Sequence, residues 1–326
     1  MNESITLDSF SNLEAPWRQL LTNCANNDIF ITPQWQSAWW QVFGRDYELQ
    51  LISVYDGQEL VGIAPLKRRE GVLSFNGSPD VCDYMDFIAV KEKEDYVFSQ
   101  LLEYLEKTAW RSLELDSLLP GSLALRHFVP LAKQKGYRVE IKQTNVSPHL
   151  LLPQNWEDYL ALLKTKDRHE LRRKLRRLEQ TQSVNYSTIV EKDLLSLAMD
   201  NFFKLFQLSN TEKANFMTDK KSAFFTTMVS SLAEQGNVRL SFLEINGVRA
   251  GTTLCFDYNN DISLYNSAYD PAYSSLSVSL LLKVFNIRDA VEHGKKRFDF
   301  LSGNEPYKYD LGGHDVPLYR CLITRS

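Results

Sequence analysis

The sequence has few cysteines and histidines, and they form no pattern that would bind a metal. Its four Cys and five His are scattered along 326 residues, so they predict neither a disulfide framework nor a zinc site. No run reaches the roughly 18 apolar residues of a membrane span. The first residues also lack the charged and apolar regions of a signal peptide. We therefore expect no bound metal, no transmembrane segment and a cytoplasmic location.

Positive charge is concentrated in one short segment. The formal net charge is −4, yet residues 164–177 carry eight Lys and Arg against two acids, which makes this segment +6 and the remaining chain −10. Within it, Arg168, Arg172 and Arg176 recur every four residues and share one face of a helix. We expect this basic helix to bind an anionic partner, and donor phosphates, a phosphate-linked glycan carrier, an anionic membrane surface and RNA all fit. The alternative is a solvated face, and without interleaved aromatic residues no specific nucleic acid is expected.

Two hairpin signals occur in corresponding places of the two halves. Asp56-Gly57 and Asn246-Gly247 are dipeptides that favour a two-residue hairpin turn. Each lies between two strand-like runs, residues 49–55 and 60–66 in the first half and 238–245 and 250–256 in the second. The two halves therefore start with the same arrangement of strands.

The order of the following segments also repeats. A long helix is predicted over residues 96–109 and again over 277–293, and each leads into a strand with one acid among apolar residues. This repetition predicts two tandem α/β modules with mixed central sheets flanked by helices, at residues 1–147 and 148–326. Further helices are expected over residues 156–180, 194–208 and 219–234.

The segment 297–308 is the strongest candidate for a functional site. A short apolar strand ends at Gly303, and Glu305, Tyr307 and Lys308 follow on an irregular segment. An acid, a phenol and an ammonium beyond a rigid strand are typical of a group-transfer site. A plain surface turn is the alternative.

The order of elements in the second half resembles a known family. The order is a strand, a hydroxyl-rich turn, a helix, a strand with Asp299 and then Gly-x-Glu-x-Tyr-Lys. This order resembles the C-terminal module of the CelD-like and FemAB-like branch of the GNAT acyltransferases. The resemblance implies that two parallel strands splay apart and that a backbone amide in the gap holds the acyl carbonyl. It also implies that the helix after the first strand receives pyrophosphate at its N-terminus. These parts correspond to residues 262–268, 297–301 and 273–279.

The resemblance implies acyl-CoA as co-substrate, held by the turn and the start of the helix. The residues are Ser274, Ser275, Ser277, Val278 and Ser279. Free N–H groups at a helix start attract anions, and serine hydroxyls add donors. The glycine-rich pyrophosphate loop of ordinary GNAT enzymes is missing, and a Ser-rich helix cap is the alternative.

Four residues are the catalytic candidates. Asp299 alternates with two Phe residues and therefore points away from their apolar face. The resemblance implies that it faces the cleft, where it would accept the proton of an incoming amine; the alternative is that it satisfies a nearby backbone amide. Glu305 is a second candidate base, and Tyr307 is the candidate proton donor to the leaving group. The resemblance favours Lys308 as the charge that stabilises the oxyanion or holds a donor phosphate.

The first half offers an acceptor-side feature. Asp83-Tyr84 resembles an acceptor-binding element of the same branch, and a turn with capping acids is the alternative. The predicted helix of this half starts in an acidic turn, which would repel phosphate. The first module is therefore expected to lack a working donor site.

Together these observations predict an N-acyltransferase that moves an acyl group from acyl-CoA to an amino group. The expected acceptor is a small molecule or a glycan precursor of cell-envelope or exopolysaccharide biosynthesis. One alternative is an aminoacyl-tRNA-dependent transferase acting on a peptidoglycan precursor, as in the FemAB branch. The other is a non-catalytic scaffold that binds a glycan or a synthase.

Overall fold

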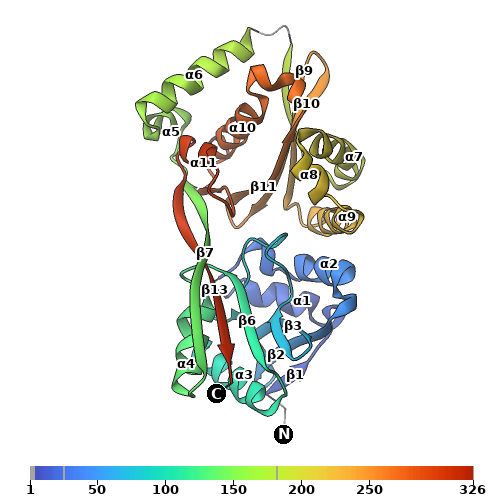
Figure 1. The fold of residues 1–326 in the computed structure, drawn as a ribbon, viewed down its shortest axis with the longest axis vertical. Coiled ribbons are helices and arrows are strands. Elements are labelled where there is room, and N and C mark those ends of the chain that lie inside the picture. Colours follow the sequence, from blue (N-terminus) through green and yellow to red (C-terminus); the bar gives the residue numbers. More distant parts are fainter. Residues whose placement is uncertain (1–3, 25, 181–182, 326) are drawn as a thin grey trace. The chain divides into compact units, whose positions relative to one another are not determined.

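The computed structural model describes residues 4–24, 26–180 and 183–325, and the chain forms two compact units (Figure 1). Unit 1 comprises Met1–Asn145 with Val316–Ser326, and unit 2 comprises Val146–Asp315. The last eleven residues therefore lie with unit 1 and not in the module 148–326 to which the sequence analysis assigned them. The roles of an acceptor module and a donor module stay predictions.

Unit 1 is a mixed sheet with helices, and it uses both ends of its part of the chain. Its helices and helical turns are α1 (Phe10–Leu21), η1 (Ile29–Ile31), α2 (Pro33–Phe43), η2 (Gly44–Asp46), α3 (Glu94–Lys107), η3 (Ala124–Phe128) and α4 (Val129–Gln134). Its strands are β1 (Ile5–Leu7), β2 (Glu48–Asp56), β3 (Glu59–Arg69), β4 (Val72–Phe75), β5 (Ile88–Ala89) and β6 (Ser112–Leu118). Two further strands, β7 (Arg138–Leu151) and β13 (His314–Thr324), each contribute residues to both units.

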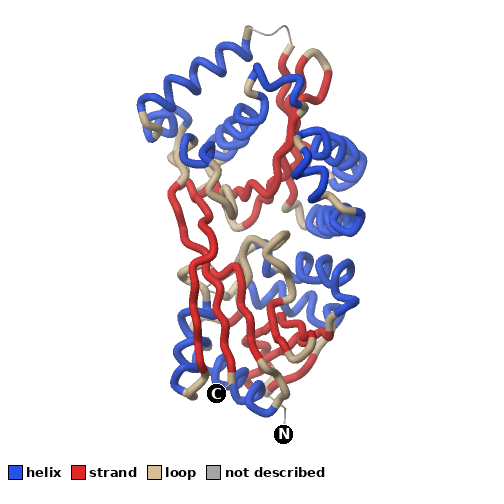
Figure 2. The backbone as a smooth tube through the Cα atoms, viewed as in Figure 1, coloured by secondary structure: helices blue, strands red, loops and turns tan. Residues whose placement is uncertain are grey.

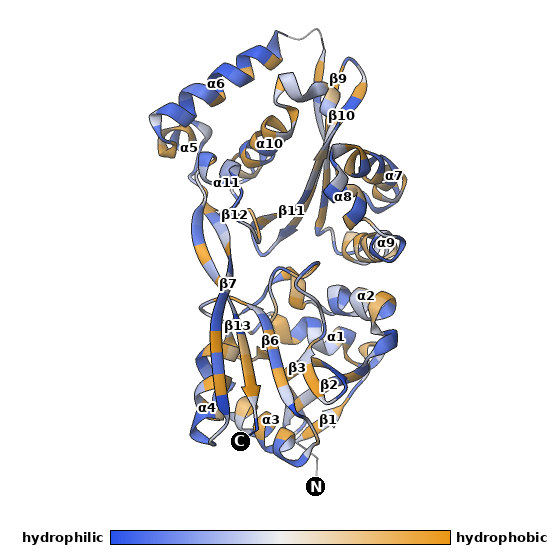
Figure 3. Cartoon of the chain, in the orientation of Figure 1, coloured by the Kyte–Doolittle hydropathy of each residue, from blue (hydrophilic) through white to orange (hydrophobic). Residues whose placement is uncertain are grey.

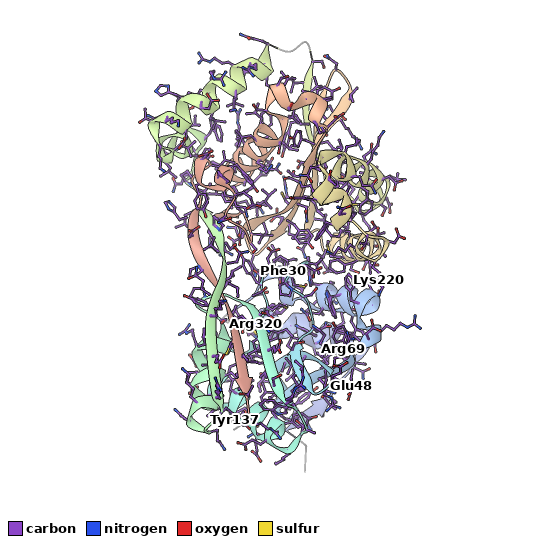
Figure 4. All side chains as sticks on the ribbon, in the orientation of Figure 1. Phe30, Glu48, Arg69, Tyr137, Lys220 and Arg320 are labelled. Atoms are coloured by element: carbon purple, nitrogen blue, oxygen red, sulfur yellow. The ribbon has the colours of Figure 1, made fainter. Side chains whose placement is uncertain are left out.

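The strand order in unit 1 is β1-β2-β3-β4-β6-β13-β7, with β5 paired to β3. The predicted hairpin at Asp56-Gly57 is confirmed, because β2 and β3 pair antiparallel across it. Aromatic residues fill much of the core, including Phe30, which lies edge-on to Tyr84 at 5.6 Å between ring centroids. On the sheet, Arg320 of β13 forms an ion pair with Glu114 of β6; Figure 4 labels Phe30 and Arg320.

A buried carboxylate fixes the start of the helical segment that contains η3 and α4. Asp86 accepts hydrogen bonds from the backbone N–H groups of Phe87, Leu123 and Ala124 at 2.7–3.0 Å and from the Asn26 side chain at 2.6 Å. Burial raises the pKa of Asp86 to about 7, although these four donors oppose the shift. The side chain therefore caps free N–H groups at a helix start.

We expect Asp86→Asn to lower the free energy of unfolding of unit 1 by about 2 kcal/mol, because the amide NH₂ would face backbone donors. The raised pKa adds a pH dependence. Between about pH 4 and 7 the folded wild type retains a proton that the unfolded chain releases, so its stability falls as pH rises through this range, and the variant lacks this trend. Urea unfolding is followed by tryptophan fluorescence, which reports mainly on unit 1 because five of the six Trp residues lie there. The exposed Asp46→Asn is the control. A variant as stable as the wild type would refute the capping role.

Unit 2 contains the larger helical part of the chain. Its helices are α5 (Trp156–Leu162), α6 (Thr165–Glu179), α7 (Lys192–Ser209), α8 (Thr211–Phe216), α9 (Asp219–Ala233), η4 (Pro271–Leu276), α10 (Val278–Glu292) and α11 (Pro306–Asp310). Its strands, besides the shared ones, are β8 (Val184–Ile189), β9 (Val238–Ile245), β10 (Val248–Tyr258), β11 (Asp261–Tyr269) and β12 (Arg297–Asp299).

The strand order in unit 2 is β7-β12-β11-β10-β9-β8. The predicted hairpin at Asn246-Gly247 is confirmed by the antiparallel pair β9 and β10. Figure 1 shows α7, α8 and α9 on one side of β9–β11, and α5, α6 and α10 on the other. Gly251 of β10 permits this packing, because a Cβ there would lie 2.8 Å from Val278 of α10. The predicted class, mixed α/β with helices flanking the sheet, is confirmed.

The single helix predicted over residues 156–180 is wrong in one respect. The chain breaks into α5 and α6, because Leu163 and Lys164 adopt extended backbone with ψ of 144° and 145°. The break lets Leu160 and Leu163 before it, and Leu171 after it, all reach the core of unit 2. Figure 3 colours most of α6 as hydrophilic, as expected for the basic segment.

Candidate donor pocket in unit 2

Two parallel strands diverge in unit 2. β11 and β12 pair in parallel over only three residues each, from Asp261 and Arg297 to Ser263 and Asp299. β12 ends there, whereas β11 continues to Tyr269 after a register shift against β10 between Leu254 and Cys255. The last residues of β11 therefore have no β12 residue opposite them. This is the splayed pair that the resemblance implied.

Side chains from α7 and α8 occupy part of the exposed edge of β11. Ser209 at the end of α7 accepts from the Tyr269 N–H at 2.8 Å and donates to the Tyr269 carbonyl at 3.0 Å. Lys213 of α8 donates to the Ser267 carbonyl. In antiparallel pairing, alternate residues direct N–H and C=O away from the partner, so Ser267 and Tyr269 present these groups on the edge opposite β10. Much of this edge is thus already hydrogen-bonded.

A left-handed residue forms the junction of η4 and α10. Ser277 has φ 57° and ψ 34°, and its side chain caps no backbone N–H of α10. Its hydroxyl instead accepts from Lys174 of α6 at 3.2 Å. Nearby, Arg177 of α6 donates to the Ser275 carbonyl at 2.6 Å. The basic helix therefore contacts the turn that the sequence analysis assigned to the donor.

The loop after β12 is held by two buried charged residues. Asp299 is fully buried and accepts from the Leu301 N–H at 2.8 Å, and its other oxygen lies 3.2 Å from His149 Nε2. Burial would raise the pKa of Asp299, but the hydrogen bond and charge of His149 outweigh it and lower the pKa. Asp299 thus accepts a hydrogen bond from a backbone amide, which was the alternative to a role in proton transfer. It does not line the pocket described below.

Lys308 holds the same loop from the other side. Its side chain is 2% exposed, and its Nζ donates to the carbonyls of Leu301, Ser302 and Gly303 at 2.8–3.1 Å and pairs with Glu305 at 2.9 Å. Gly303 has φ 118°, and a Cβ there would meet Glu305 Oε2 at 2.5 Å. Only glycine fits this position. Lys308 therefore anchors this loop, and its N–H groups are occupied by hydrogen bonds to the loop itself.

The remaining groups converge on one pocket of about 430 Å³, which we call the α10 pocket. Its walls come from α6, α8, β11, the η4–α10 junction and the loop before α11. It is lined by Lys174, Lys213, Ser267, Tyr269, Ser274, Ser277, Val278, Ser279, Leu280, Lys283, Glu305 and Tyr307. Of the predicted residues it brings together Glu305 and Tyr307 with four of the five predicted cofactor residues; Ser275 is not among its lining residues.

Three lysines from three helices give the α10 pocket its charge. Lys174, Lys213 and Lys283 face a single carboxylate, Glu305, in the lining. Burial lowers the pKa of Lys283 to about 7 and, with a smaller effect, that of Lys213. Glu305 keeps 55% of its side chain exposed. The pocket therefore suits a ligand with more than one negative charge.

Tyr307 packs inside the pocket. Its ring lies under Lys283 Nζ at 4.7 Å from the centroid and edge-on to Phe300 at 6.3 Å. Burial raises the pKa of its hydroxyl. The phenol is therefore neutral at ordinary pH and is a candidate proton donor.

The outward residues of the basic helix are placed differently. Arg172 lies 3.5 Å from Glu157, and Arg173 and Lys174 pair with Glu170. For Arg168 and Arg176, the described part of the chain shows no acidic partner. These side chains stay candidates for an anionic partner, but they do not line the α10 pocket.

The predicted acceptor residues lie in unit 1. Tyr84 is 3% exposed and packs in the aromatic core, whereas Asp83 is half-buried. The buried position of Tyr84 favours a packing role. An acceptor role for either residue stays a prediction.

The sequence analysis missed Lys213, Lys283 and Ser209. Lys283 had a detectable signal, because it is a lone charge within the apolar run of α10. It also follows Ser279 by four residues and therefore lies on the same helix face. Lys213 gave none, since it lies on α8, which was not predicted. Ser209 gave none either, since it is the last residue of α7 and its contact is with Tyr269, 60 positions away. Within the described residues, no group of three or more His, Cys, Asp and Glu is placed to hold a metal ion.

Residues 165–309 match the family described as "Acetyltransferase (GNAT) domain". This segment lies inside unit 2 and includes the entire α10 pocket. The chain thus contains a GNAT acetyltransferase domain, and this domain supports a transferase activity. No curated protein matches the sequence.

Solved structures resemble the chain over almost its full length. FemX superposes with a TM-score of 0.67 at 11% identity and covers 98% of this chain and 97% of its own. The C-terminal domain of a putative lysylphosphatidylglycerol synthetase from Agrobacterium fabrum gives 0.62 at 10% identity, with 96% and 92% covered. A tandem GNAT protein from the clavulanic acid biosynthesis pathway gives 0.54 at 11% identity, with 97% of each chain covered. At 10–11% identity these likenesses show a shared fold, which a tandem GNAT protein also has.

The structure also bears on membrane association. None of the helices in the described ranges combines the length and the apolar character that crossing a membrane requires.

Proposed function

We propose that the protein is an N-acyltransferase whose activated donor carries phosphate groups and binds in the α10 pocket. The cluster of Lys174, Lys213 and Lys283 beside the start of α10 carries this proposal. Free helix N–H groups, serine hydroxyls and ammonium groups together are suited to phosphate oxygens. The acceptor is an amino group, and the resemblance to the CelD-like and FemAB-like branch favours one on a sugar or a cell-envelope precursor.

The chemical step is attack of the neutral amine on the donor carbonyl. A C–N bond forms, the C–O or C–S bond to the donor breaks, and the amine loses one proton. Glu305, partly exposed at the pocket, accepts this proton. The leaving atom takes a proton from Lys213 or Tyr307. Of these two, Lys213 has the lowered pKa and is the better acid.

Two donors are compatible with the pocket, and the geometry favours aminoacyl-tRNA over acyl-CoA. The gap edge of β11, where the resemblance places the acyl carbonyl of acyl-CoA, is already bonded by Ser209 and Lys213. The basic helix α6 adjoins the pocket through Lys174 and Arg177, and its outward arginines would continue a path for a polynucleotide. The lysylphosphatidylglycerol synthetase among the similar structures is named for transfer of a lysyl group. Acyl-CoA, the donor expected from the sequence, is the second candidate here, and the name of the matching family, an acetyltransferase, supports it.

Either donor would place the reaction in the cytoplasm. A panel assay tests the proposal: labelled aminoacyl-tRNAs and acyl-CoAs are offered with amino sugars and peptidoglycan precursors, and label in the amide product is counted. We expect transfer from at least one of these donors, and we expect Lys174→Glu to reduce this transfer greatly. Transfer that this variant leaves intact would remove the α10 pocket from the reaction.

The outward face of α6 gives a separate prediction. Reversing Arg172 and Arg176 to Glu is expected to weaken binding of a polynucleotide donor at least tenfold at 0.1 M salt and to reduce the slope of log K against log salt by about 2, one for each lost phosphate contact. The charge-matched control is Lys204→Glu with Lys220→Glu on α7 and α9; Figure 4 labels Lys220. Filter binding of tRNA across a salt titration measures both quantities. Equal losses in both double variants would indicate only a general charge effect.

A further inference from the structure

Lys283 occupies an unusual place for a lysine. It lies in the second turn of α10, is 2% exposed, and lines the α10 pocket. Side chains on a helix lean toward its N-terminus, and Lys283 accordingly reaches back to the Ser279 carbonyl at 2.9 Å and hydroxyl at 3.0 Å. An ammonium has three N–H groups, one more than these two acceptors use. Among the described residues, the third N–H has no oxygen or nitrogen acceptor, and the Tyr307 ring centroid lies 4.7 Å from Nζ. It can therefore bind a ligand beside the helix start.

We propose that Lys283 is a proton-linked contact for the anionic group of the donor, so that binding of this group in the α10 pocket takes up one proton on the Lys283 amine. The inference rests on the proposed function, since it takes the α10 pocket as the donor site. It adds that the donor end bound here is a dianionic tetrahedral group, a phosphate or its equivalent, and that its affinity depends on pH.

The surroundings of Lys283 explain the coupling. The charged and titratable groups around it come from every element packed against it: Lys174 (α6), Lys213 (α8), Cys255 (β10), Glu305 (the loop before α11), and Tyr307 and Lys308 (α11). Burial has the largest effect on the pKa of Lys283 and the charge of Lys213 the next largest, and together they lower this pKa to about 7. A bound dianion would offset both effects, because it adds an opposite charge in a poorly solvated site.

Sulfate is a suitable probe, because it stays a tetrahedral dianion throughout the pH range of the test. Titration calorimetry of the full-length protein at pH 8, in buffers of different ionisation enthalpy, is expected to show uptake of about 0.9 proton per sulfate bound, falling to about 0.1 at pH 6. Sulfate affinity is expected to decrease about tenfold from pH 6 to pH 8, since only the protonated amine binds well.

Two variants of Lys283 separate charge from proton uptake. Lys283→Arg keeps a permanent charge, so sulfate should bind without proton uptake and with little pH dependence. Lys283→Met retains the length of the side chain and should bind weakly at every pH. Lys204→Met, at an exposed lysine of α7 outside the pocket, should behave as the wild type. Circular dichroism confirms that each variant is folded.

The proposal is overturned if the wild type binds sulfate without proton uptake, if Lys283→Met retains the uptake, or if sulfate does not bind. Transfer by the wild type is assayed in parallel. Transfer without proton-linked sulfate binding would refute only the role of Lys283. Proton-linked binding without transfer would refute only the proposed function.

Discussion

Lys308→Met is expected to lower the free energy of unfolding by about 3–5 kcal/mol and to abolish transfer. The Lys308 ammonium is buried and binds three consecutive carbonyls and the Glu305 carboxylate. Removing it leaves these carbonyls buried without a donor, and each such loss costs about 1–3 kcal/mol. The loop also contains Leu301 at φ 57°, a conformation that persists only while its surroundings enforce it.

Chemical unfolding of Lys308→Met, followed by far-UV circular dichroism, measures the loss. Lys204→Met is the matched control, since its side chain is exposed and its loss should change stability by less than about 0.5 kcal/mol. A variant with wild-type stability and a strongly reduced kcat would contradict the anchoring role. It would restore the original hypothesis that this ammonium stabilises the oxyanion.

Glu305→Gln is expected to lower kcat by about 10²–10³ with little change in KM, because the amide cannot accept the proton of the attacking amine. The substitution keeps an oxygen that can accept from Lys308, and the side chain is more than half exposed. Stability should therefore stay within about 0.5 kcal/mol of the wild type.

Steady-state kinetics with the donor identified by the panel assay measures this effect. Glu212→Gln is the control, because Glu212 lies next to Lys213 on α8 but is exposed and outside the pocket lining. A Glu305→Gln variant that keeps the wild-type kcat would assign proton transfer to another group. An equal loss in both variants would point to a general effect of charge near Lys213.

The elements governed by local chemistry were predictable from the sequence. Asp56-Gly57 and Asn246-Gly247 each determine a turn within two residues, and both hairpins formed as expected. The apolar run of α10 and the glycine after it gave that helix to within one residue at each end. Glu305, Tyr307 and the serines before α10 followed from the order of elements.

The parts that depend on long-range packing were not predictable. Asp299 was expected either to accept the amine proton, as the resemblance implied, or to satisfy a backbone amide. Its alternation with two Phe residues gives only the side of the strand and does not decide between these roles. The side chain is buried there because His149 of β7 supplies a partner 150 positions away in sequence. Lys308 was expected to stabilise the oxyanion or to hold a donor phosphate, since nothing local indicates that the backbone of residues 301–303 folds around its ammonium.

The break between α5 and α6 has a similar origin. The leucine periodicity continues through residues 160–178, and no proline or glycine interrupts it. The chain nevertheless adopts extended backbone at Leu163 and Lys164, and leucines from both segments pack in the core of unit 2. Tertiary packing therefore overrides local helix propensity at Leu163 and Lys164.

The α10 pocket is expected to bind a phosphate-bearing donor, and aminoacyl-tRNA is expected to be this donor. A competition assay tests both points: one labelled amine acceptor is offered aminoacyl-tRNA and acyl-CoA together, and the two amide products are separated by mass. We expect the aminoacyl product in excess, with its formation reduced at least tenfold in Lys174→Glu and unchanged in Lys220→Glu. Acyl transfer from acyl-CoA alone, unaffected by Lys174→Glu, would show that the α10 pocket does not bind the donor in this way.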